Sequence, residues 1–502
     1  MGSRQAGATS RLPSLIRPQQ MRREKELGAA SLTEGLAAEL RRLMQAGRLA
    51  RGERLPASRI LAKDLGLSRN TVTAAYAQLV AEGYLATRTG AGTYVEHRLP
   101  EDNLPQSPAP RNWAAEEPTL ARRAAAALDL NPAWQRSGQF ALSPGVPALD
   151  LYPREAFARI ARSYWRGAAR RDLGYGNEDE ELRAELVRYL SQARGLDCQP
   201  EQVIVVGSSL QAFMLIAHVL CDVGDGVVIE DPGYATAAAM LTATGLRPCP
   251  EPVDGQGLDV TRFSPAAMEA RLAIVSPVAQ YPYGCDMTPA RRNALCRWAL
   301  ERRVWLVEDD FNSEHRWEGT PLPPLAAGPA AGQIIHVSSL NRVLAPGLKL
   351  AYLVVPERLI PAFSGMNDIL SLAAPGAHQR IVADFMASGG LAAHLRQMRS
   401  IYRERAEALA AALDRRLRTV FEIPAVQAGL HMTLRARLPL DDARLSLLLR
   451  RRWIDAPALS SYALLRRDLR GLVLGFGNTP PRSMEMLVSR IAESLGELET
   501  TS

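Results

Sequence analysis

The sequence predicts a two-part protein of the α/β class, in which an N-terminal winged helix-turn-helix precedes a large α/β lobe and a smaller C-terminal lobe. Three observations support this prediction. The first hundred residues contain three helical stretches and a hairpin, a proline-rich spacer follows, and strand-like apolar runs then alternate with helices. The length of 502 residues also exceeds one ordinary domain.

The composition is that of a globular protein, with 47% hydrophobic and 23% charged residues. No run of about 18 apolar residues occurs, which argues against a membrane span. The first thirty residues lack the apolar core of a secretory signal, so we expect a cytoplasmic protein. The five cysteines show no C-x-x-C spacing, and the sequence therefore predicts neither a disulfide framework nor a metal site.

Positive charge is concentrated at the N-terminal end. Residues 1–98 contain sixteen Lys and Arg against eight Asp and Glu, a net charge of +8. The whole chain carries +7, so the remaining residues carry −1. This distribution is typical of an N-terminal module that faces phosphate groups, joined to a domain that does not. A basic extension at residues 1–30 contributes to it.

Residues 31–97 are predicted to form the winged helix. Leucines recur at helical spacing in its first helix, and Ser68 is a good N-cap for its third. Gly66 makes the turn between the second and third helices, and a glycine-rich turn joins the two strands. The predicted elements are helices at residues 31–46, 58–65 and 68–82 and strands at residues 85–89 and 93–95.

The third helix has the character of a DNA recognition helix, because polar side chains face outward at its start. Such a helix enters the major groove with its N-terminal end. Residues of the second helix and of the wing would then lie near the phosphate backbone. The alternative, a winged helix used only for protein contacts, does not explain the basic charge. The predicted DNA contacts are Arg59, Ser68, Arg69, Asn70, Thr71, Thr73, Thr89 and Gly90.

Residues 98–135 are rich in proline and are predicted to be an exposed linker that contains a short helix at residues 120–130. Residues 136–498 then show the alternation of strands and helices that produces a mostly parallel sheet. After about residue 386 the pattern changes to a long helix and a few strands, which indicates the smaller lobe. Ligands of such folds usually bind between the lobes, at the carboxyl ends of the strands. The strands predicted for the large lobe are 203–206, 226–230, 272–275, 304–308, 334–337 and 350–355, and those for the small lobe are 429–435 and 471–477.

Two sets of motifs resemble known families. LPASR (55–59), LGLSRNTV (65–72), AEGYL (81–85) and TGAGT (89–93) resemble the GntR-type winged helix. LGYG (173–176), EDPGY (230–234), QYP (280–282), EDDFNSE (308–314), LAPGLKLAY (344–352) and GLH (429–431) resemble the fold-type I aminotransferases, which bind pyridoxal 5′-phosphate (PLP). Together they make residues 31–498 similar to the MocR/GabR family of transcription regulators.

The resemblance implies a homodimer that binds double-stranded operator DNA and whose ligand state changes that binding. It also implies a cofactor cleft near Tyr175. Asp309 matches the aspartate that pairs with the pyridine nitrogen of PLP, and Lys349 matches an arginine that holds its phosphate. The cleft residues carried over from the resemblance are Ser208, Ser209, Tyr234, Tyr281, Asp309, Ser339, Arg342 and Lys349.

The sequence departs from the family where the cofactor would be bound covalently. PLP enzymes need a lysine that forms an imine with the cofactor aldehyde. Arg342 stands at that position, and a guanidinium, which stays protonated, cannot form the imine. The chain has only three lysines, Lys25, Lys63 and Lys349, and none is free for this role. We therefore expect PLP to bind without a covalent bond, if it binds, and we expect no enzyme activity.

Other contact positions have also changed. Phe311 replaces a tyrosine, Ala279 a histidine and Leu210 a glutamine, and Tyr283 stands where a small residue is usual. Val473 aligns with the arginine that grips a substrate carboxylate, although Arg466, Arg467 and Arg470 lie close by in sequence. The landmarks of the fold persist while the groups that would touch the cofactor have drifted. That combination favours a regulator over an enzyme.

Three hypotheses follow. The first is a sequence-specific regulator whose degenerate aminotransferase-like domain senses a small ligand, in which Arg342 itself can clamp a carboxylate or phosphate. The second is a working PLP-dependent aminotransferase with a DNA-binding appendage, which the missing lysine opposes. The third is a regulator whose large domain is a ligand-free dimerisation scaffold, for which no small molecule would alter DNA binding or the melting temperature.

Overall fold

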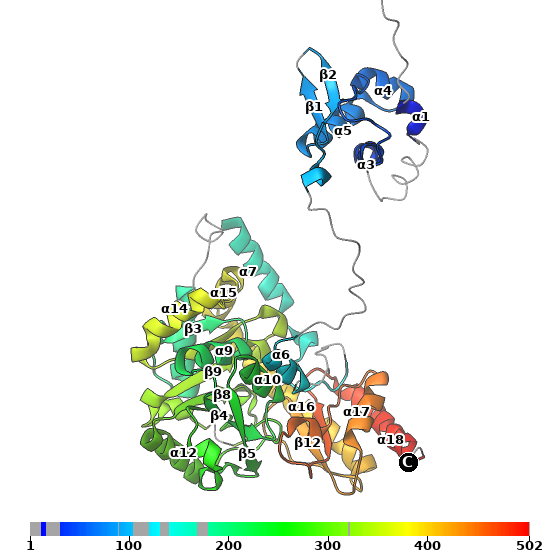
Figure 1. Cartoon of the computed structure of the whole chain (residues 1–502). Helices are drawn as coiled ribbons and strands as arrows, with labels where there is room; N and C mark the ends of the chain where they lie inside the picture. Colours follow the sequence, from blue (N-terminus) through cyan, green and yellow to red (C-terminus); the bar gives the residue numbers. More distant parts are fainter. Residues whose placement is uncertain are drawn as a thin grey trace, which may run out of the picture. The chain divides into compact units, whose positions relative to one another are not determined.

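The computed structural model describes residues 12–16, 31–88, 90–103, 120–130, 140–167, 179–319 and 322–500. The chain divides into two compact units, Met1–Pro118 and Thr119–Ser502 (Figure 1). The division falls within the spacer predicted at residues 98–135. Within the described residues, no helix is both long enough and apolar enough to cross a membrane.

The first unit is a winged helix, which confirms the predicted fold. It contains helices α3 (Leu32–Gln45), α4 (Ser58–Leu65) and α5 (Arg69–Ala81) and the antiparallel strands β1 (Leu85–Arg88) and β2 (Gly92–Val95). A capping box starts α3, because the Ser31 hydroxyl accepts from the Glu34 N–H and the Glu34 carboxylate accepts from the Ser31 N–H. Gly66 ends α4 in the left-handed region, at φ 62°.

The core of this unit is built from leucines of all three helices. Leu40 and Leu79 are fully buried in it. Leu12, at the start of the short helix α1 (Leu12–Leu15), and Ile16, just after it, belong to the same core. The segment predicted as a basic extension, residues 1–30, therefore includes residues that belong to the packing of the winged helix.

The large lobe of the second unit is built on an eight-stranded sheet with the order β3-β10-β9-β8-β7-β4-β5-β6. Strands β5, β4, β7, β8 and β9 run parallel to one another, whereas β10 is antiparallel to both β9 and β3. The mostly parallel sheet predicted from the sequence is confirmed. Its strands are β3 (Val203–Val206), β4 (Gly226–Asp231), β5 (Arg247–Asp254), β6 (Gly257–Leu258), β7 (Leu272–Val275), β8 (Trp305–Asp310), β9 (Ile334–Ser339) and β10 (Ala351–Val354).

Strand β5 escaped the sequence analysis because proline occupies every second position in it. Pro248, Pro250 and Pro252 alternate with residues that face β4. Successive residues of a parallel strand direct their N–H groups to opposite sides. The missing N–H groups of the prolines therefore lie on the side of β5 away from β4, and the hydrogen bonds to β4 are kept. Proline is tolerated in such a position near the edge of a sheet.

Helices cover both faces of this sheet (Figure 1). One of them, α10 (Ala235–Ala243), is buried on nearly every side and consists mainly of alanine. The predicted helix of the linker region forms as α6 (Arg122–Asp129) and packs against α10. Alanines on both helices permit this close approach. The other helices of the large lobe are α7 (Arg154–Gly167), α8 (Glu180–Tyr189), α9 (Ser209–Leu220), α11 (Pro265–Met268), α12 (Pro289–Arg302), α13 (Leu340–Val343), α14 (Ile360–Leu370) and α15 (Gly376–Ala387).

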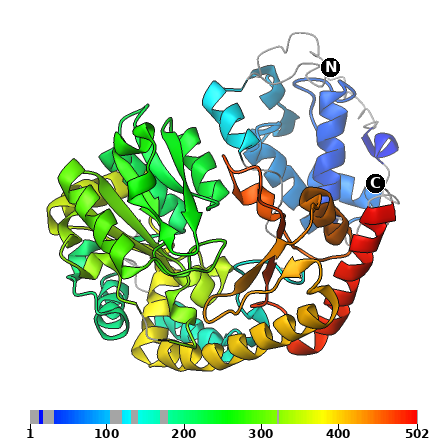
Figure 2. The same ribbon diagram turned by 90° about the horizontal axis from the view of Figure 1, so that it is seen from below.

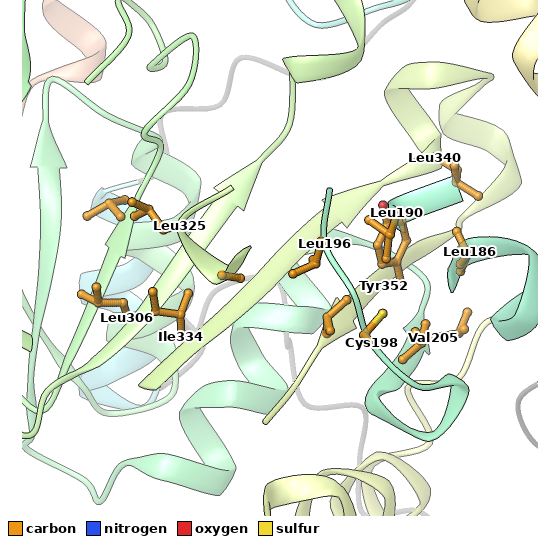
Figure 3. Packing of buried hydrophobic residues seen from close by; sticks show 14 of the residues in the cluster. Leu186, Leu190, Leu196, Cys198, Val205, Leu306, Leu325, Ile334, Leu340 and Tyr352 are labelled. Carbon is orange, nitrogen blue, oxygen red and sulfur yellow. The ribbon is translucent and has the colours of Figure 1, made fainter. Parts of the chain in front are cut away.

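The main apolar core lies on one face of the sheet. Figure 3 shows Leu186, from α8, and Tyr352, on β10, among its members. Leu306 and Ile334 extend the same core along β8 and β9. A second core lies on the other face, where Val307 and Val337 are fully buried. Burial on both faces makes successive residues at the start of β8 and β9 apolar, which is why the sequence predicts these strands clearly.

The small lobe is an antiparallel sheet packed on helices. Its strands are β11 (Phe421–Glu422), β12 (His431–Ala436) and β13 (Gly471–Gly475), and its helices are α17 (Asp442–Arg451) and α18 (Met484–Thr500). The long helix α16 (Gly390–Leu417) runs from the large lobe into this lobe (Figure 2). The helical stretch predicted from about residue 386 is interrupted at Gly389, which has φ 75°.

All five cysteines are free thiols, as Cys198 and Cys221 illustrate. Burial raises the pKa of Cys198 to about 11 and that of Cys221 to about 12. Burial also raises the pKa of Cys285 to about 12 and raises those of Cys249 and Cys296. The thiols are therefore protonated, weakly reactive members of the interior.

Candidate functional site

The recognition helix α5 begins with a hydroxyl cap. The Ser68 hydroxyl accepts a hydrogen bond from the Thr71 N–H at 3.1 Å, and the two hydroxyl oxygens lie 2.8 Å apart. Ser68 thus fixes the start of the helix, and the side chain of Thr71 is held against it. Both were predicted to contact DNA, and the structure gives both of them a role in the helix cap as well.

The residues that follow the cap are exposed. Arg69, Asn70 and Thr73 are all exposed, and none has a hydrogen-bond or ion-pair partner among the described residues. Arg59, on α4, is equally exposed and equally unpaired there. These side chains are available to base edges and phosphates.

The wing turns at Gly90, which is exposed at φ 76° and has nothing within 4 Å of where a Cβ would stand. Thr89 lies outside the described residues. Arg88 was missed by the sequence analysis. It is exposed beside the turn, and its guanidinium lies 5.0 Å from the centre of the Tyr94 ring. The signal that could have found it is a basic residue adjacent to the glycine turn.

In the large lobe, the turn from β3 into α9 forms a cradle of backbone groups. The Gln211 side chain accepts from the Gly207 N–H at 2.8 Å, and the Ser208 hydroxyl accepts from the Gln211 N–H at 3.2 Å. The N–H groups of Ser209 and Leu210 have no acceptor among the described residues. They point along the start of a twelve-residue helix, the arrangement that favours an anion.

Asn341, which the sequence analysis did not assign to the site, joins this cradle to the segment that carries Lys349. Its amide donates to the Gly207 carbonyl at 3.3 Å and accepts from the Leu350 N–H at 2.9 Å. The Ser339 hydroxyl donates to the Leu350 carbonyl at 3.3 Å. Lys349 is exposed with a left-handed backbone at φ 54°. Ser339 therefore holds the segment beside the cradle through this hydrogen bond, and Lys349 lies at the edge of the cradle.

Asp309, at the end of β8, is buried, and no residue that the structure describes gives its carboxylate a hydrogen bond. Burial raises the pKa of Asp309 to about 7, and the positive charge of Arg342 acts in the opposite direction. A buried carboxyl without a hydrogen-bond donor is costly, and such groups are frequent at ligand sites.

Arg342 lies on the four-residue helix α13, whose N-cap is Ser339. Its guanidinium carbon lies 4.8 Å from the centre of the Phe311 ring. The Nη1 atom is buried without a partner among the described residues. A Cβ on Gly145, which has φ 72°, would approach this atom to 2.5 Å, so a larger residue there would require the arginine side chain to shift.

Aromatic rings enclose these charged groups. The hydroxyl oxygens of Tyr281 and Tyr462 lie 2.8 Å apart. The Tyr281 ring makes edge contacts with Tyr234, Phe311 and His431, with centroid distances of 6.5, 5.6 and 4.9 Å. Burial lowers the pKa of His431 to about 4, so this ring is neutral. Tyr462 is a further member that the sequence analysis missed.

Val473, for which the sequence analysis predicted correspondence to a substrate-binding arginine, is fully buried in the same cluster as Tyr281 and Phe311. Arg466, which was considered as a substitute, forms an ion pair with Asp468 at the surface instead. The described residues of the candidate site thus fall into two groups. The cradle contains Ser208, Ser209, Ser339 and Lys349, and the enclosed cluster contains Tyr234, Tyr281, Asp309 and Arg342. Tyr175 lies outside the described residues.

The fold and these sites define a class: a regulatory winged helix followed by an aminotransferase-type domain. Residues 32–95 match the model for bacterial regulatory proteins of the gntR family, and residues 139–453 match the model for class I and II aminotransferases. The structure resembles an archaeal alanine:glyoxylate aminotransferase, with a TM-score of 0.67 and 22% identity over 75% of this chain and 96% of the other. LysN, the α-aminoadipate aminotransferase of Thermus thermophilus, gives a TM-score of 0.66 and 23% identity, over 76% of this chain and 96% of the other.

Relatives that share both parts are regulators. The probable rhizopine catabolism regulatory protein MocR of Rhizobium meliloti is 31% identical over 93% of this chain and 94% of its own. The pyridoxine biosynthesis transcriptional regulator PdxR of Corynebacterium glutamicum is 31% identical over 93% of this chain and 96% of its own. The chain belongs to the MocR/GabR family of transcription regulators.

Proposed function

We propose that this chain is a sequence-specific regulator that binds operator DNA as a homodimer in the cytoplasm and holds a small anionic ligand in its aminotransferase-like domain without a covalent bond. The observation that carries the proposal is the guanidinium of Arg342, which lies over Phe311 and acts electrostatically on Asp309. By the motif resemblance, Arg342 corresponds to the imine-forming lysine.

An arginine there changes what the domain can do. A guanidinium remains protonated at any ordinary pH, so it is not a nucleophile toward an aldehyde. Catalysis by PLP requires that nucleophile. The domain therefore acts as a binding module and not as an aminotransferase.

The residues present fit PLP in part. The free N–H groups of Ser209 and Leu210, with Lys349 at the edge, suit a phosphate. Asp309 suits a protonated ring nitrogen, which PLP would supply together with its electron-withdrawing ring. The imine position does not fit. The ligand is thus PLP held non-covalently or another anion that reaches Arg342, whose unpartnered Nη1 can bind a carboxylate or phosphate.

At the other end of the chain, the exposed residues of the recognition helix would read base edges. Arg69, Asn70 and Thr73 are placed for the major groove, and Arg59 and Gly90 for the phosphate backbone. Ser68 and Thr71 would contribute through the cap, and Thr89 through the wing. A homodimer of such modules requires paired half-sites in the operator.

The test is a visible absorbance titration of the full chain with PLP, followed by borohydride reduction and peptide mass mapping. We expect no reducible imine in the natural protein and a new absorbance band with a reducible adduct at position 342 in Arg342→Lys. Arg358→Lys, a change at an exposed arginine over Trp305, controls for a lysine added elsewhere and should stay colourless.

A reducible adduct in the aminotransferase-like domain of the natural protein would overturn the non-covalent proposal. Thermal unfolding with and without PLP separates the remaining hypotheses, because a ligand that binds only the folded state raises the melting temperature. No shift in the natural protein and no band in Arg342→Lys would favour a ligand-free scaffold.

A further inference from the structure

A polar cavity lies apart from the cluster around Arg342. Its volume is ≈ 540 Å³, within the range of about 300–1,000 Å³ that small-molecule sites occupy. It lies between the end of α8, the segment after β8 and the long helix α16. None of the residues proposed above for the cofactor cleft lines it. Its lining is Tyr189, Ala193, Arg194, Ser313, Glu314, Arg316, Trp317, Gly319, Leu395, Arg396, Arg399, Ser400 and Arg403.

The two sites belong to opposite faces of the sheet. Arg194, in the wall of the cavity, pairs with Asp310 at 2.8 Å, and both side chains are almost completely buried. Asp310 directly follows Asp309 on β8, and successive side chains of a strand point to opposite faces. A π-helical turn, Leu190–Arg194, ends α8 and delivers Arg194 to this position. Such turns are frequent at functional sites.

Five of the thirteen lining residues are arginines. Arg396, Arg399 and Arg403 recur at three- and four-residue spacing on α16, so they share one face of that helix. Arg194 and Arg316 approach from the large lobe. This concentration of guanidinium groups in one cavity focuses a positive potential on its interior.

Partners within the chain neutralise three of these arginines. Arg194 pairs with Asp310, Arg316 with Asp286 at 2.6 Å, and Arg403 with Glu407 at 2.8 Å. Arg396 and Arg399 have no carboxylate partner among the described residues, and Arg399 donates only to the Glu314 carbonyl, at 3.4 Å. Two positive charges are therefore left without compensation.

The deeper wall is polar as well. The Ser313 hydroxyl is buried without a hydrogen-bond partner in the described structure, and the residue is only 7% exposed. The Tyr189 hydroxyl donates to the Glu314 carboxyl at 3.4 Å. Glu314 is the only carboxylic residue in the lining, and burial raises its pKa to about 7, which reduces its negative charge. An orphaned donor and a weakened carboxylate suit an anionic guest.

We propose that this cavity is a second ligand site, which binds a small molecule with at least two negative charges, either a polycarboxylate or a phosphate compound. Arg396 and Arg399 bind the charged groups in bidentate fashion, and Ser313 donates to the inner end of the ligand. The charge of the ligand matches the two uncompensated guanidinium groups.

The experiment is calorimetric titration of the full-length chain with inorganic pyrophosphate, and separately with citrate, at low ionic strength. We expect one saturable site that depends on Arg396 and Arg399. Arg396→Gln/Arg399→Gln should weaken binding by about tenfold to a hundredfold, because it removes the two guanidinium groups that have no carboxylate partner, while their exposure to solvent limits the loss. Arg415→Gln/Arg416→Gln, at the far end of the same helix and paired with Glu485, should bind as the natural protein does.

Ser313→Ala provides a second readout with no change of net charge, and we expect it to weaken binding severalfold while both arginine variants keep the natural melting temperature. Dependence on Arg396 and Arg399 with only one of the two probes would support the site and identify its anion class. Absence of a saturable site for both probes would overturn the proposal. So would equal loss in the two arginine variants, because binding would then reflect general surface charge.

Discussion

The winged helix and the aminotransferase-like domain differ in where they keep their charged functional groups. In the winged helix, Arg59 and Arg69 are exposed and unpaired in the described structure. In the large domain, Asp309 is buried and has a raised pKa, and Arg342 is tucked against Phe311. The difference teaches that the first surface presents its unpaired charges to solvent, whereas the second site encloses its charged groups among buried aromatic rings.

The largest expected effect tests whether the two units unfold independently, as expected from a core of its own in each. Leu40→Ala removes a fully buried side chain of the winged-helix core, and such changes cost about 2–5 kcal/mol. We expect calorimetry to show a lowered transition for the winged helix and an unchanged transition for the large domain. Leu306→Ala, in the core of the large lobe, should do the reverse. A common shift of both transitions in either variant would contradict this separation.

The next effect sharpens the picture of the exposed surface. Arg69→Ala should weaken operator binding by about 1–3 kcal/mol without altering the fold, because the side chain is exposed and unpaired. Fluorescence anisotropy on an operator selected from random sequences measures it. Arg42→Ala serves as the control. It removes an exposed arginine of α3, a different helix of the same unit, where Arg42 pairs with Glu39. Equal losses in the two variants would indicate nonspecific charge instead of base recognition.

The last prediction tests the buried site through the pH dependence of stability. The folded pKa of Asp309, about 7, lies above its ordinary value of 3.8, so the folded state holds this proton over an interval in which the unfolded state has released it. Asp309 therefore makes the protein less stable as the pH rises through that interval. In Asp309→Asn this loss of stability should be absent. The loss in the natural protein amounts to at most about 1.4 kcal/mol for each unit by which the pKa is raised. Urea unfolding at pH 5 and pH 8 compares the two proteins, and parallel changes would show that Asp309 titrates normally.

Most of the fold could be predicted from the sequence, because its signals are local. Strands buried on both faces read as apolar runs, and Ser68 and Gly66 mark the ends of helices through the chemistry of their caps. Strand β5, with its alternate prolines, was not predicted. Whether such a segment can form a strand depends on which of its sides pairs with β4, and the sequence does not show this. The contribution of Leu12 and Ile16 to the winged-helix core escaped because a four-residue helix has no detectable period.

The candidate site was predictable only where a family motif covers it. Arg342, Asp309 and Tyr281 were named from motifs, and the structure brings them together. Tyr462 was missed because it comes from a distant segment and carries no motif, and its position depends on how the small lobe folds back. Arg396 and Arg399 have the appearance of an ordinary solvated helix face, since the residues that convert that face into a cavity wall lie on other elements.

The buried thiols have a practical consequence. Each unit by which a thiol pKa is raised lowers the reactive thiolate fraction at a given pH about tenfold. Because burial raises the pKa of all five native cysteines, maleimide chemistry at neutral pH should leave them largely unmodified. One cysteine introduced on an exposed position of the wing or of α16 would therefore carry a dye alone, and the natural chain already serves as its own silent background for fluorescence work.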